Sequence, residues 1–464
     1  MNSKDKILII GAGLCGSLLA LRLAQRGYKI ELREERSDLR KTDISAGKSI
    51  NLAFSDRGIK ALKMVGVVDK VFPLCIPMTG RMIHSIESEA FLSPYSAREG
   101  EYINSVSRGQ LNGLLLDEVE KFDNVTLLFN SECTSVDLEN NTATFFDKNY
   151  DKVEIVAAAI IFGADGAGSI LRKEMFLQRS ILFSYSQQFL EHGYKELSIP
   201  PTESGGFRTY KNALHIWPRG EYMLIALPNL DGSFTVTLFL PHSSSEYSFS
   251  ELNTDEKVSN FFQKQFPDAL ELMPNLIEEY HNNPVGNLGT IKCSPWSYKE
   301  KTMLIGDAAH AVVPFYGQGM NASFEDVYVL DQYIEKYEGD WNKILVEYEK
   351  ERKKDADAIG DLAVENFYEM RDHVSNPIFK KKRLIEMELE TNHPYYSKYS
   401  MVTFKEDMPY SEAKKIGNAQ DKALLNLIAD NKIEGLNSKE IFELVNKEVT
   451  EILDDDKVDK TMHH

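Results

Sequence analysis

The first residues that could do chemistry are three glycines and one acid near the amino terminus. Gly11, Gly13 and Gly16 stand in the loop GAGLCG, directly after the apolar segment KILII. The first glycine of such a loop makes a tight turn, the second lets a pyrophosphate approach the backbone, and the third lets helix and strand pack closely. Glu34, 18 residues after Gly16, ends the next apolar segment, where an acid accepts hydrogen bonds from ribose hydroxyls. The loop therefore predicts an adenine dinucleotide site, for NAD or FAD.

Two aspartates in later motifs favour FAD over NAD. Asp165 stands in GADGAGS after the apolar segment IVAAAIIF, and Asp307 stands in GDAAH after TMLI. An acid at the carboxyl end of a strand, beside a helix start, is placed to hold the hydroxyls of a ribityl chain, which nicotinamide dinucleotides lack. Each motif alone is typical of a simple turn. The ordered set of three is more specific and predicts FAD.

The elements that must position these residues follow from the hydrophobic pattern. Lys6 to Ile10, Ser17 to Arg26 and Tyr28 to Arg33 give a strand, a helix and a second strand, a βαβ unit. Alternating apolar runs such as Tyr222 to Leu227 and Phe234 to Leu240 indicate an antiparallel sheet. The predicted fold is α/β: a Rossmann-like domain with an inserted antiparallel sheet and a helical carboxyl-terminal region.

Changes in sequence texture suggest where the parts divide. We expect the dinucleotide domain over residues 1–179 and again over 292–336, with the antiparallel sheet domain between them over 180–291. Residues 337–464 are expected to be helical. In that tail Ile441, Leu444 and Val445 begin an apolar stripe at helical spacing, which predicts a packing face rather than a membrane-surface helix, because its polar face is acidic.

Composition excludes several classes of protein. The chain of 464 residues has 53 Lys and Arg against 71 Asp and Glu, a net charge of −18, which disfavours nucleic acid and anionic membranes as partners. The four cysteines have no CxxC spacing, and no metal-binding motif occurs, so we expect no metal. No signal peptide pattern and no apolar run of membrane length are present. We expect a cytoplasmic protein.

With these motifs in order, the sequence resembles the single-component, flavin-dependent aromatic hydroxylases of the para-hydroxybenzoate hydroxylase class. Within that class the similarity to the kynurenine 3-monooxygenase family is specific, and it spans about residues 6–405. It is carried by the stretches SINLAFSDRGIKAL, IPMTGRMIHS, YINSVSR, HGYKELSIPP, LHIWPRG, GDAAHAVVPFYGQGMNASFED, ENFYEMRDHV and YSMVTF.

The resemblance implies a bound FAD that NADPH reduces transiently and O2 converts to a flavin hydroperoxide, which hydroxylates L-kynurenine to 3-hydroxykynurenine. Its implied FAD contacts, besides the glycine loop, are Cys15, Glu34, Arg36, Ala53, Arg108, Cys133, Asp307, Met320 and Asn321. The implied substrate contacts are Arg81, Tyr95, Asn366 and Tyr399, with Phe239, Phe315, Tyr316 and Met370 lining the ring pocket. A guanidinium with phenol and amide groups suits the α-carboxylate of kynurenine.

Other interpretations stay open at this point. The same fold could hydroxylate another aminoaryl or phenolic acid, or the chain could be a catalytically silent FAD-binding protein. His310 stands near Asp307 but has no obvious triad partner, so we expect it to be structural or next to the flavin. The single dinucleotide loop leaves the NADPH docking site undefined, and the sequence leaves a homodimer open.

Overall fold

A six-stranded, mostly parallel sheet carries the glycine loop. The computed structural model describes residues 6–41, 51–86, 89–370 and 377–462, with side chains described up to residue 455. Along the sheet the strands run β18 (Ser297–Tyr298), β19 (Thr302–Leu304), β12 (Ile160–Gly163), β1 (Lys6–Ile10), β2 (Lys29–Arg33) and β8 (Val125–Leu128). All neighbours pair in parallel except β18 and β19. Because parallel strands end at the same edge, their terminal loops meet there.

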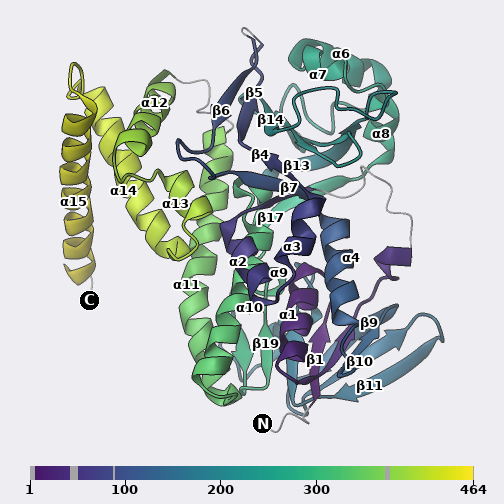
Figure 1. Ribbon diagram of the computed structural model, residues 1–464. Coiled ribbons are helices and arrows are strands. Elements are labelled where there is room, and N and C mark those ends of the chain that lie inside the picture. Colours follow the sequence, from purple (N-terminus) through teal and green to yellow (C-terminus); the bar gives the residue numbers. More distant parts are fainter. Residues whose placement is uncertain (1–5, 42–50, 87–88, 371–376, 463–464) are drawn as a thin grey trace.

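Helices cover this sheet and bury its central strands β1 and β12. Ile7, Leu8 and Ile9 of β1 have no exposed surface, as expected for a strand packed on both faces. The helices of this part are α1 (Leu14–Gln25), α2 (Asp56–Met64), α3 (Val68–Val71), α4 (Arg108–Val119), α5 (Ile170–Leu177), α9 (Asp307–His310) and α10 (Gly319–Lys336), with 3-10 turns at Leu39–Lys41, Phe72–Leu74 and Pro314–Tyr316. Helix α1 packs between α4 and α10 beside the sheet (Figure 1).

A seven-stranded, mainly antiparallel sheet forms the upper part of the molecule in Figure 1. Its strands run β17 (Val285–Ser294), β13 (Ser184–Ile199), β16 (Phe234–Pro241), β15 (Met223–Pro228), β14 (Ala213–Pro218), β5 (Gly80–Ile83) and β6 (Phe91–Pro94). Helices α6 (Asp255–Gln265), α7 (Pro267–Leu270) and α8 (Leu276–Asn282) pack on its far side, where they share a core with Trp217 and Phe234. Strand β5 pairs in parallel with β14, so residues 80–94 join this sheet although they precede residue 179.

Two small sheets complete the strands. One joins β3 (Asn51–Phe54), β7 (Ile103–Ser107) and β4 (Cys75–Met78), and the other joins β9 (Ser131–Asp137), β10 (Thr142–Asp147) and β11 (Lys152–Ala157). The apolar run IVAAAIIF, which its composition suggests to be a single strand, is divided between two strands of different sheets. Its first half belongs to β11, where Ile155 is 70% exposed, and its second half forms the buried strand β12. Apolar composition alone does not separate an exposed edge from a core strand.

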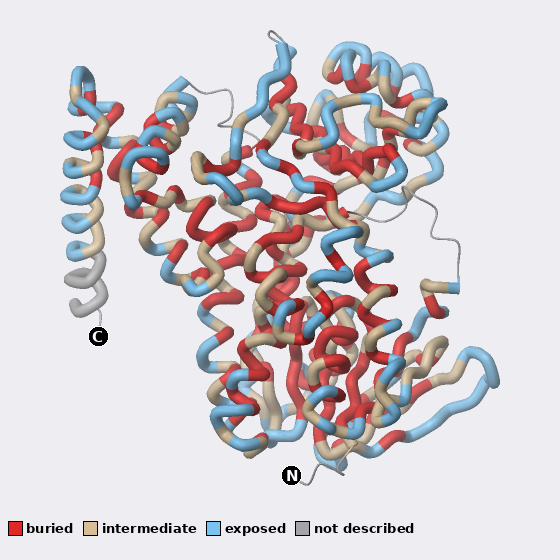
Figure 2. Tube along the Cα trace, viewed as in Figure 1, coloured by how far each residue is buried: buried red, intermediate tan, exposed pale blue. Residues whose placement is uncertain are grey.

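The carboxyl-terminal helices stand to one side of both sheets (Figure 1). They are α11 (Trp341–Tyr368), α12 (Pro377–Asn392), α13 (Lys398–Phe404), α14 (Tyr410–Ala429) and α15 (Ser438–Met462). The stripe that begins at Ile441 and Val445 packs with Leu424 and Leu427 of α14 and with Leu389 of α12, whereas the opposite face of α15 is exposed (Figure 2). The apolar stripe is thus a packing face.

The predicted fold class is confirmed, with differences at element ends. Helix α1 begins at Leu14, inside the GAGLCG loop, rather than at Ser17. Helix α10 begins at Gly319, whereas the sequence pattern suggests a start near Ala322. The sequence pattern predicts a helix from Trp341 to Val374; helix α11 ends at Tyr368, and residues 371–374 lie outside the described residues. The predicted division at residues 179, 291 and 336 stays a prediction. Within the described part of the chain, no helix is both long and apolar enough to cross a membrane.

Candidate active site

A large cavity lies where the carboxyl ends of the parallel strands meet the antiparallel sheet. Its volume is about 890 Å³, near the upper end of the range for ligand pockets, roughly 300–1,000 Å³. The predicted cofactor residues that line it are Gly11, Gly13, Cys15, Glu34, Arg36, Ala53, Arg108, Cys133, Asp165, Asp307 and Met320. The cavity also reaches Arg81, Phe239, Phe315, Tyr316, Met370 and Tyr399 of the predicted substrate site. The structure therefore brings the two predicted sites into one continuous space.

The glycine loop has the steric properties that its sequence predicts. Gly11 has φ +98°, and a Cβ there would lie 2.5 Å from the carbonyl oxygen of Ala164, so a side chain is excluded twice over. A Cβ on Gly16 would lie 2.0 Å from the Gly11 oxygen. A Cβ on Gly13, in contrast, would meet nothing within 4 Å, although this residue lines the cavity. The space above Gly13 is thus available for a ligand that approaches the backbone at the start of α1.

Glu34 and Arg36 form the rim of the cavity beyond the glycine loop. The Glu34 carboxylate accepts a hydrogen bond from the backbone N–H of Ala12 at 2.9 Å and pairs with the Arg36 guanidinium at 2.6 Å. Glu34 is buried, whereas the Arg36 side chain is 71% exposed. The pairing raises the pKa of Arg36. A buried acid fixed to the glycine loop at the end of β2 is the geometry that ribose recognition requires.

Asp165 and Asp307 have different environments although their motifs look alike. Asp165 accepts the backbone N–H groups of Ile170 at 2.7 Å and of Leu171 at 3.4 Å, so one carboxylate oxygen caps helix α5. Its other oxygen is buried without a partner, and burial raises the pKa of Asp165. Asp307 is half-buried, lines the cavity, and accepts no hydrogen bond from any described residue. Asp307 is therefore the freer of the two for a ligand hydroxyl.

Two predicted cofactor residues do not line the cavity. Gly16 packs beneath the loop against Gly11, as its close contact shows. Asn321 is fully buried, and its side chain bonds the backbone of Ala53, Ser55 and Gly317. It joins the start of α10 to strand β3, two elements that carry cavity residues. These two residues support the elements that line the cavity without lining it themselves.

His310 belongs to a buried ion network behind the Gly306–Asp307 turn. Its Nε2 lies 2.6 Å from Asp326, which also accepts the backbone N–H of Gly306 at 3.1 Å and pairs with Arg352 at 3.0 Å. Burial by itself would raise the pKa of Asp326, but His310 and Arg352 outweigh it and hold the pKa below its usual range. His310 does not line the cavity, so the expectation of a structural role fits its position.

The ring side of the cavity is aromatic. Phe239 on β16 lies 4.8 Å from Phe315 between ring centroids, and Phe315 lies 4.5 Å from Phe367 of α11. Tyr316 and Met370 are also buried, at 4% and 5% exposure. These side chains give this end of the cavity an apolar wall that excludes water.

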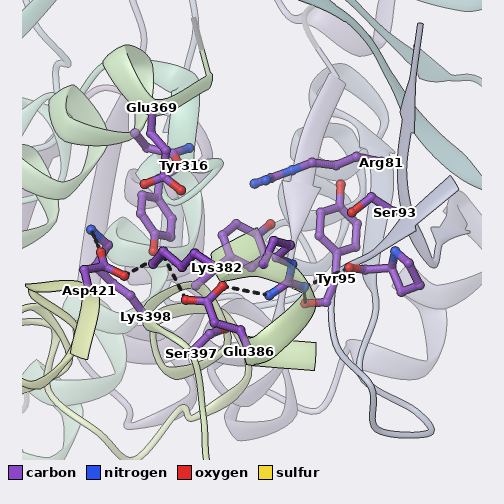
Figure 3. Close-up of a pocket in the computed structure, with 14 residues that line it drawn as sticks. Arg81, Ser93, Tyr95, Tyr316, Glu369, Lys382, Glu386, Ser397, Lys398 and Asp421 are labelled. Carbon is purple, nitrogen blue, oxygen red and sulfur yellow. Dashed lines mark hydrogen bonds and ion pairs between the residues drawn. The ribbon is translucent and has the colours of Figure 1, made fainter. Parts of the chain in front are cut away.

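A small polar pocket of about 60 Å³ adjoins this aromatic end (Figure 3). Arg81 enters it from β5, with its guanidinium carbon 4.6 Å from the ring centroid of Tyr399 and 5.6 Å from that of Tyr95. The two tyrosine rings stack at 5.4 Å. Arg81 Nε and the Tyr95 hydroxyl are both buried without a partner, and burial raises the pKa of Tyr95. Unpaired buried donors of this kind are costly unless a ligand accepts from them.

Comparison with known proteins assigns the chain to a family. Residues 4–363 match the family described as FAD binding domain. A kynurenine 3-monooxygenase from Dictyostelium discoideum is 45% identical over 440 residues, which cover 92% of this chain and 93% of that protein. One from Myxococcus xanthus is 42% identical over 450 residues and 96% of each chain. The chain belongs to the kynurenine 3-monooxygenase family.

The fold of this family member also matches solved flavoprotein structures. The tetrameric form of 2-methyl-3-hydroxypyridine-5-carboxylic acid oxygenase has 19% sequence identity and a TM-score of 0.62, covering 83% of this chain and 96% of the other. At this identity the likeness concerns the fold alone. It confirms the Rossmann-like domain with an inserted sheet, as the sequence predicts.

FAD is the cofactor of this flavin monooxygenase, and the large cavity fits it. The open space at Gly13 would take the pyrophosphate, Glu34 the adenosine ribose, and Asp307 the hydroxyls of the ribityl chain. The buried, unpaired oxygen of Asp165 offers a further acceptor at the end of strand β12, which neighbours the strand before Asp307. The donors and acceptors in the cavity therefore match the chemical groups of an extended flavin dinucleotide.

Sequence reasoning missed part of the lining. Met223 and Ile225 of β15, with Thr235 and Thr237 of β16, face the cavity at alternate positions beside Phe239. Their period of two was visible in the sequence, but which face of the strand meets the cofactor was not. Lys382, Glu386, Lys398 and Asp421 of the small pocket were not singled out, because they come from three different helices of the carboxyl-terminal region. Glu369 stands inside the stretch ENFYEMRDHV, but nothing in that stretch shows that its side chain reaches the pocket.

Replacing Asp307 should separate cofactor retention from folding. Asp307→Ala removes a carboxylate that no described residue uses, so we expect the apoprotein to unfold at an unchanged temperature while it retains much less FAD after purification. Bound flavin per chain, read from visible absorbance, measures the effect. Asp165→Ala is the contrasting variant, because it also removes the acceptor of the first two N–H groups of α5 and should lower the unfolding temperature. Full FAD occupancy in Asp307→Ala would contradict the assignment.

Proposed function

We propose that this family member hydroxylates L-kynurenine to 3-hydroxykynurenine, with NADPH as the transient reductant of FAD and O2 as the oxygen source. The observation that carries the proposal is the arrangement of the polar pocket beside the aromatic end of the FAD cavity. Kynurenine has an aminoaryl ketone at one end and an α-amino acid at the other. An aromatic chamber joined to a pocket that holds an unpaired arginine matches those two ends.

The protein groups would bind the substrate and keep it dry. Arg81, with the hydroxyls of Tyr95 and Tyr399, would hold the α-carboxylate and fix the register of the molecule along the cavity. Phe239 and Phe315 would pack on the ring and exclude water. FAD, when bound and reduced, supplies the oxygen-activating chemistry. Because the aryl amine already donates electrons into the ring, no side chain needs to act as an acid–base triad.

The proposed compartment is the cytoplasm. The four cysteines Cys15, Cys75, Cys133 and Cys293 are free thiols, which suits a reducing compartment. Burial raises the pKa of Cys133 to about 12, so this residue of the cavity wall is an unreactive thiol. The net charge of −18 supports function without a nucleic acid partner.

NADPH consumption with and without L-kynurenine tests the proposal. The FAD-loaded protein should oxidise NADPH slowly alone and at least about tenfold faster with L-kynurenine, giving a product one oxygen heavier. para-Hydroxybenzoate serves as the comparison substrate, since it lacks both the ketone and the α-amino acid. Stimulation that yields only hydrogen peroxide would mean that the true substrate is a different aminoaryl or phenolic acid. No stimulation by either compound would favour a silent FAD-binding protein.

A further inference from the structure

The charged side chains of the small pocket pair with one another, with two exceptions. Seven of them line it: Arg81, Glu369, Lys382, Arg383, Glu386, Lys398 and Asp421. Asp421 lies 2.6 Å from both Lys382 and Lys398, and Glu386 lies 2.9 Å from Lys382 and 3.5 Å from Arg383. Among the described residues, neither Arg81 nor Glu369 has an ion-pair partner within 4 Å. Arg81 and Glu369 are therefore the two charged groups of the pocket without a direct ion-pair contact, and Glu369 acts on Arg81, Lys382 and Lys398 only over a longer distance.

These two charges belong to opposite walls. Arg81 comes from β5, and its guanidinium points toward the wall that carries Glu369 and Tyr316 (Figure 3). Glu369 directly follows α11, beside the buried residues Asn366 and Met370. A cation and an anion that face each other across a gap, without touching, leave a space that a zwitterion fills. Each would then be neutralised by the opposite charge of the ligand.

The orientation of Asn366 gives an independent indication of the same polarity. Its amide nitrogen donates to the Phe315 carbonyl at 2.7 Å and to the Met370 sulfur at 3.3 Å. An amide nitrogen has two hydrogens, so both are in use. Only the amide oxygen, an acceptor, is left for a ligand. Asn366 stands three positions before Glu369, a spacing that puts both side chains on one helix face. The α11 wall thus offers acceptors, whereas the β5 wall offers donors.

We propose that Glu369, with the amide oxygen of Asn366, binds the α-ammonium group of the substrate opposite the carboxylate site at Arg81. The proposal rests on the proposed function and narrows the class of substrates: the enzyme selects aromatic ketones that carry a free α-amino acid group. Asn366 accordingly contacts the ammonium and not the carboxylate. The corresponding acid without the α-amino group, 4-(2-aminophenyl)-4-oxobutanoate, places nothing against Glu369.

The test compares two ligands on the FAD-loaded enzyme. Calorimetry gives the dissociation constants of L-kynurenine and of 4-(2-aminophenyl)-4-oxobutanoate for the wild type and for Glu369→Gln. The variant should bind L-kynurenine at least about tenfold more weakly and the ammonium-free acid within about threefold of the wild type, because only the first loses a charge-assisted pair. Glu369→Asp, which keeps the charge, should recover part of the affinity for L-kynurenine.

A matched control removes the same charge one turn earlier on α11. Glu365 pairs with Lys414 at 3.5 Å and does not line either cavity, so Glu365→Gln should leave both dissociation constants unchanged. Equal loss for the two ligands in Glu369→Gln, or no loss for either, would overturn the assignment of Glu369 while kynurenine binding by the wild type still supports the proposed function. A wild type that binds neither ligand would overturn both proposals.

Discussion

Arg81→Met should weaken L-kynurenine binding by about 30-fold to about 5,000-fold, the equivalent of about 2–5 kcal/mol for a buried charge-assisted pair. The substitution keeps most of the apolar stem beside Tyr399 and removes the only cation of the small pocket that has no ion-pair partner among the described residues. Because the guanidinium is buried and its Nε–H donates to no described acceptor, removing it should not destabilise the apoprotein. Titration of the FAD-loaded variant with L-kynurenine measures the loss.

Two further variants give this result its meaning. Arg81→Lys retains a charge but not the planar fork, so it should recover only part of the affinity. Arg179→Met removes an exposed arginine that lines neither cavity and should bind L-kynurenine as the wild type does. Flavin content should stay at the wild-type level in all three. Wild-type affinity in Arg81→Met would exclude Arg81 from the substrate site.

Gly13→Ala should lower FAD affinity at least about tenfold without destabilising the apoprotein. Gly13 has φ −68° and ψ −176°, which alanine adopts without strain, and its added Cβ would meet no protein atom within 4 Å. Replacing a glycine at such a position stabilises a fold by about 0.4–1 kcal/mol. The methyl group would instead occupy the space reserved for the pyrophosphate, and each hydrogen bond lost to a charged group costs about 1.5–3 kcal/mol. Thermal unfolding without FAD and flavin titration separate the two effects.

Neighbouring glycines provide the comparison. In Gly16→Ala the Cβ would lie 2.0 Å from the Gly11 oxygen, so the loop must shift, and both apoprotein stability and FAD affinity should fall. Gly113→Ala makes the same chemical change inside α4, where the new Cβ would be 3.4 Å from the Arg40 side chain and outside the cavity. It should leave FAD affinity unchanged and should not lower stability, because alanine is the better helix former. A Gly13→Ala protein with wild-type FAD affinity would remove Gly13 from the cofactor site.

Much of the cofactor half of the site was predictable from the sequence, for a local reason. The roles of Gly11, Gly16 and Glu34 depend on a strand, a turn and a helix that are contiguous in the chain, so spacing alone carries the geometry. The same locality explains what the sequence leaves undetermined about the two aspartates. Asp165 and Asp307 each stand shortly after a glycine that follows an apolar segment, but only the folded chain shows that one Asp165 oxygen accepts the first N–H groups of α5.

The sequence by itself determined the fold class, the dinucleotide loop and the residue types that resemble the family's substrate site. Only the tertiary structure decided which of those groups are free to bind. Arg81, Asn366 and Glu369 lie on elements far apart in the chain, and their hydrogen-bond and charge partners come from still others. Those distant partners decide whether a buried polar group is already hydrogen-bonded or is free to bind a ligand, because burial removes the water that would otherwise form its hydrogen bonds. That balance exists only once the strands of the inserted sheet and the carboxyl-terminal helices have packed together.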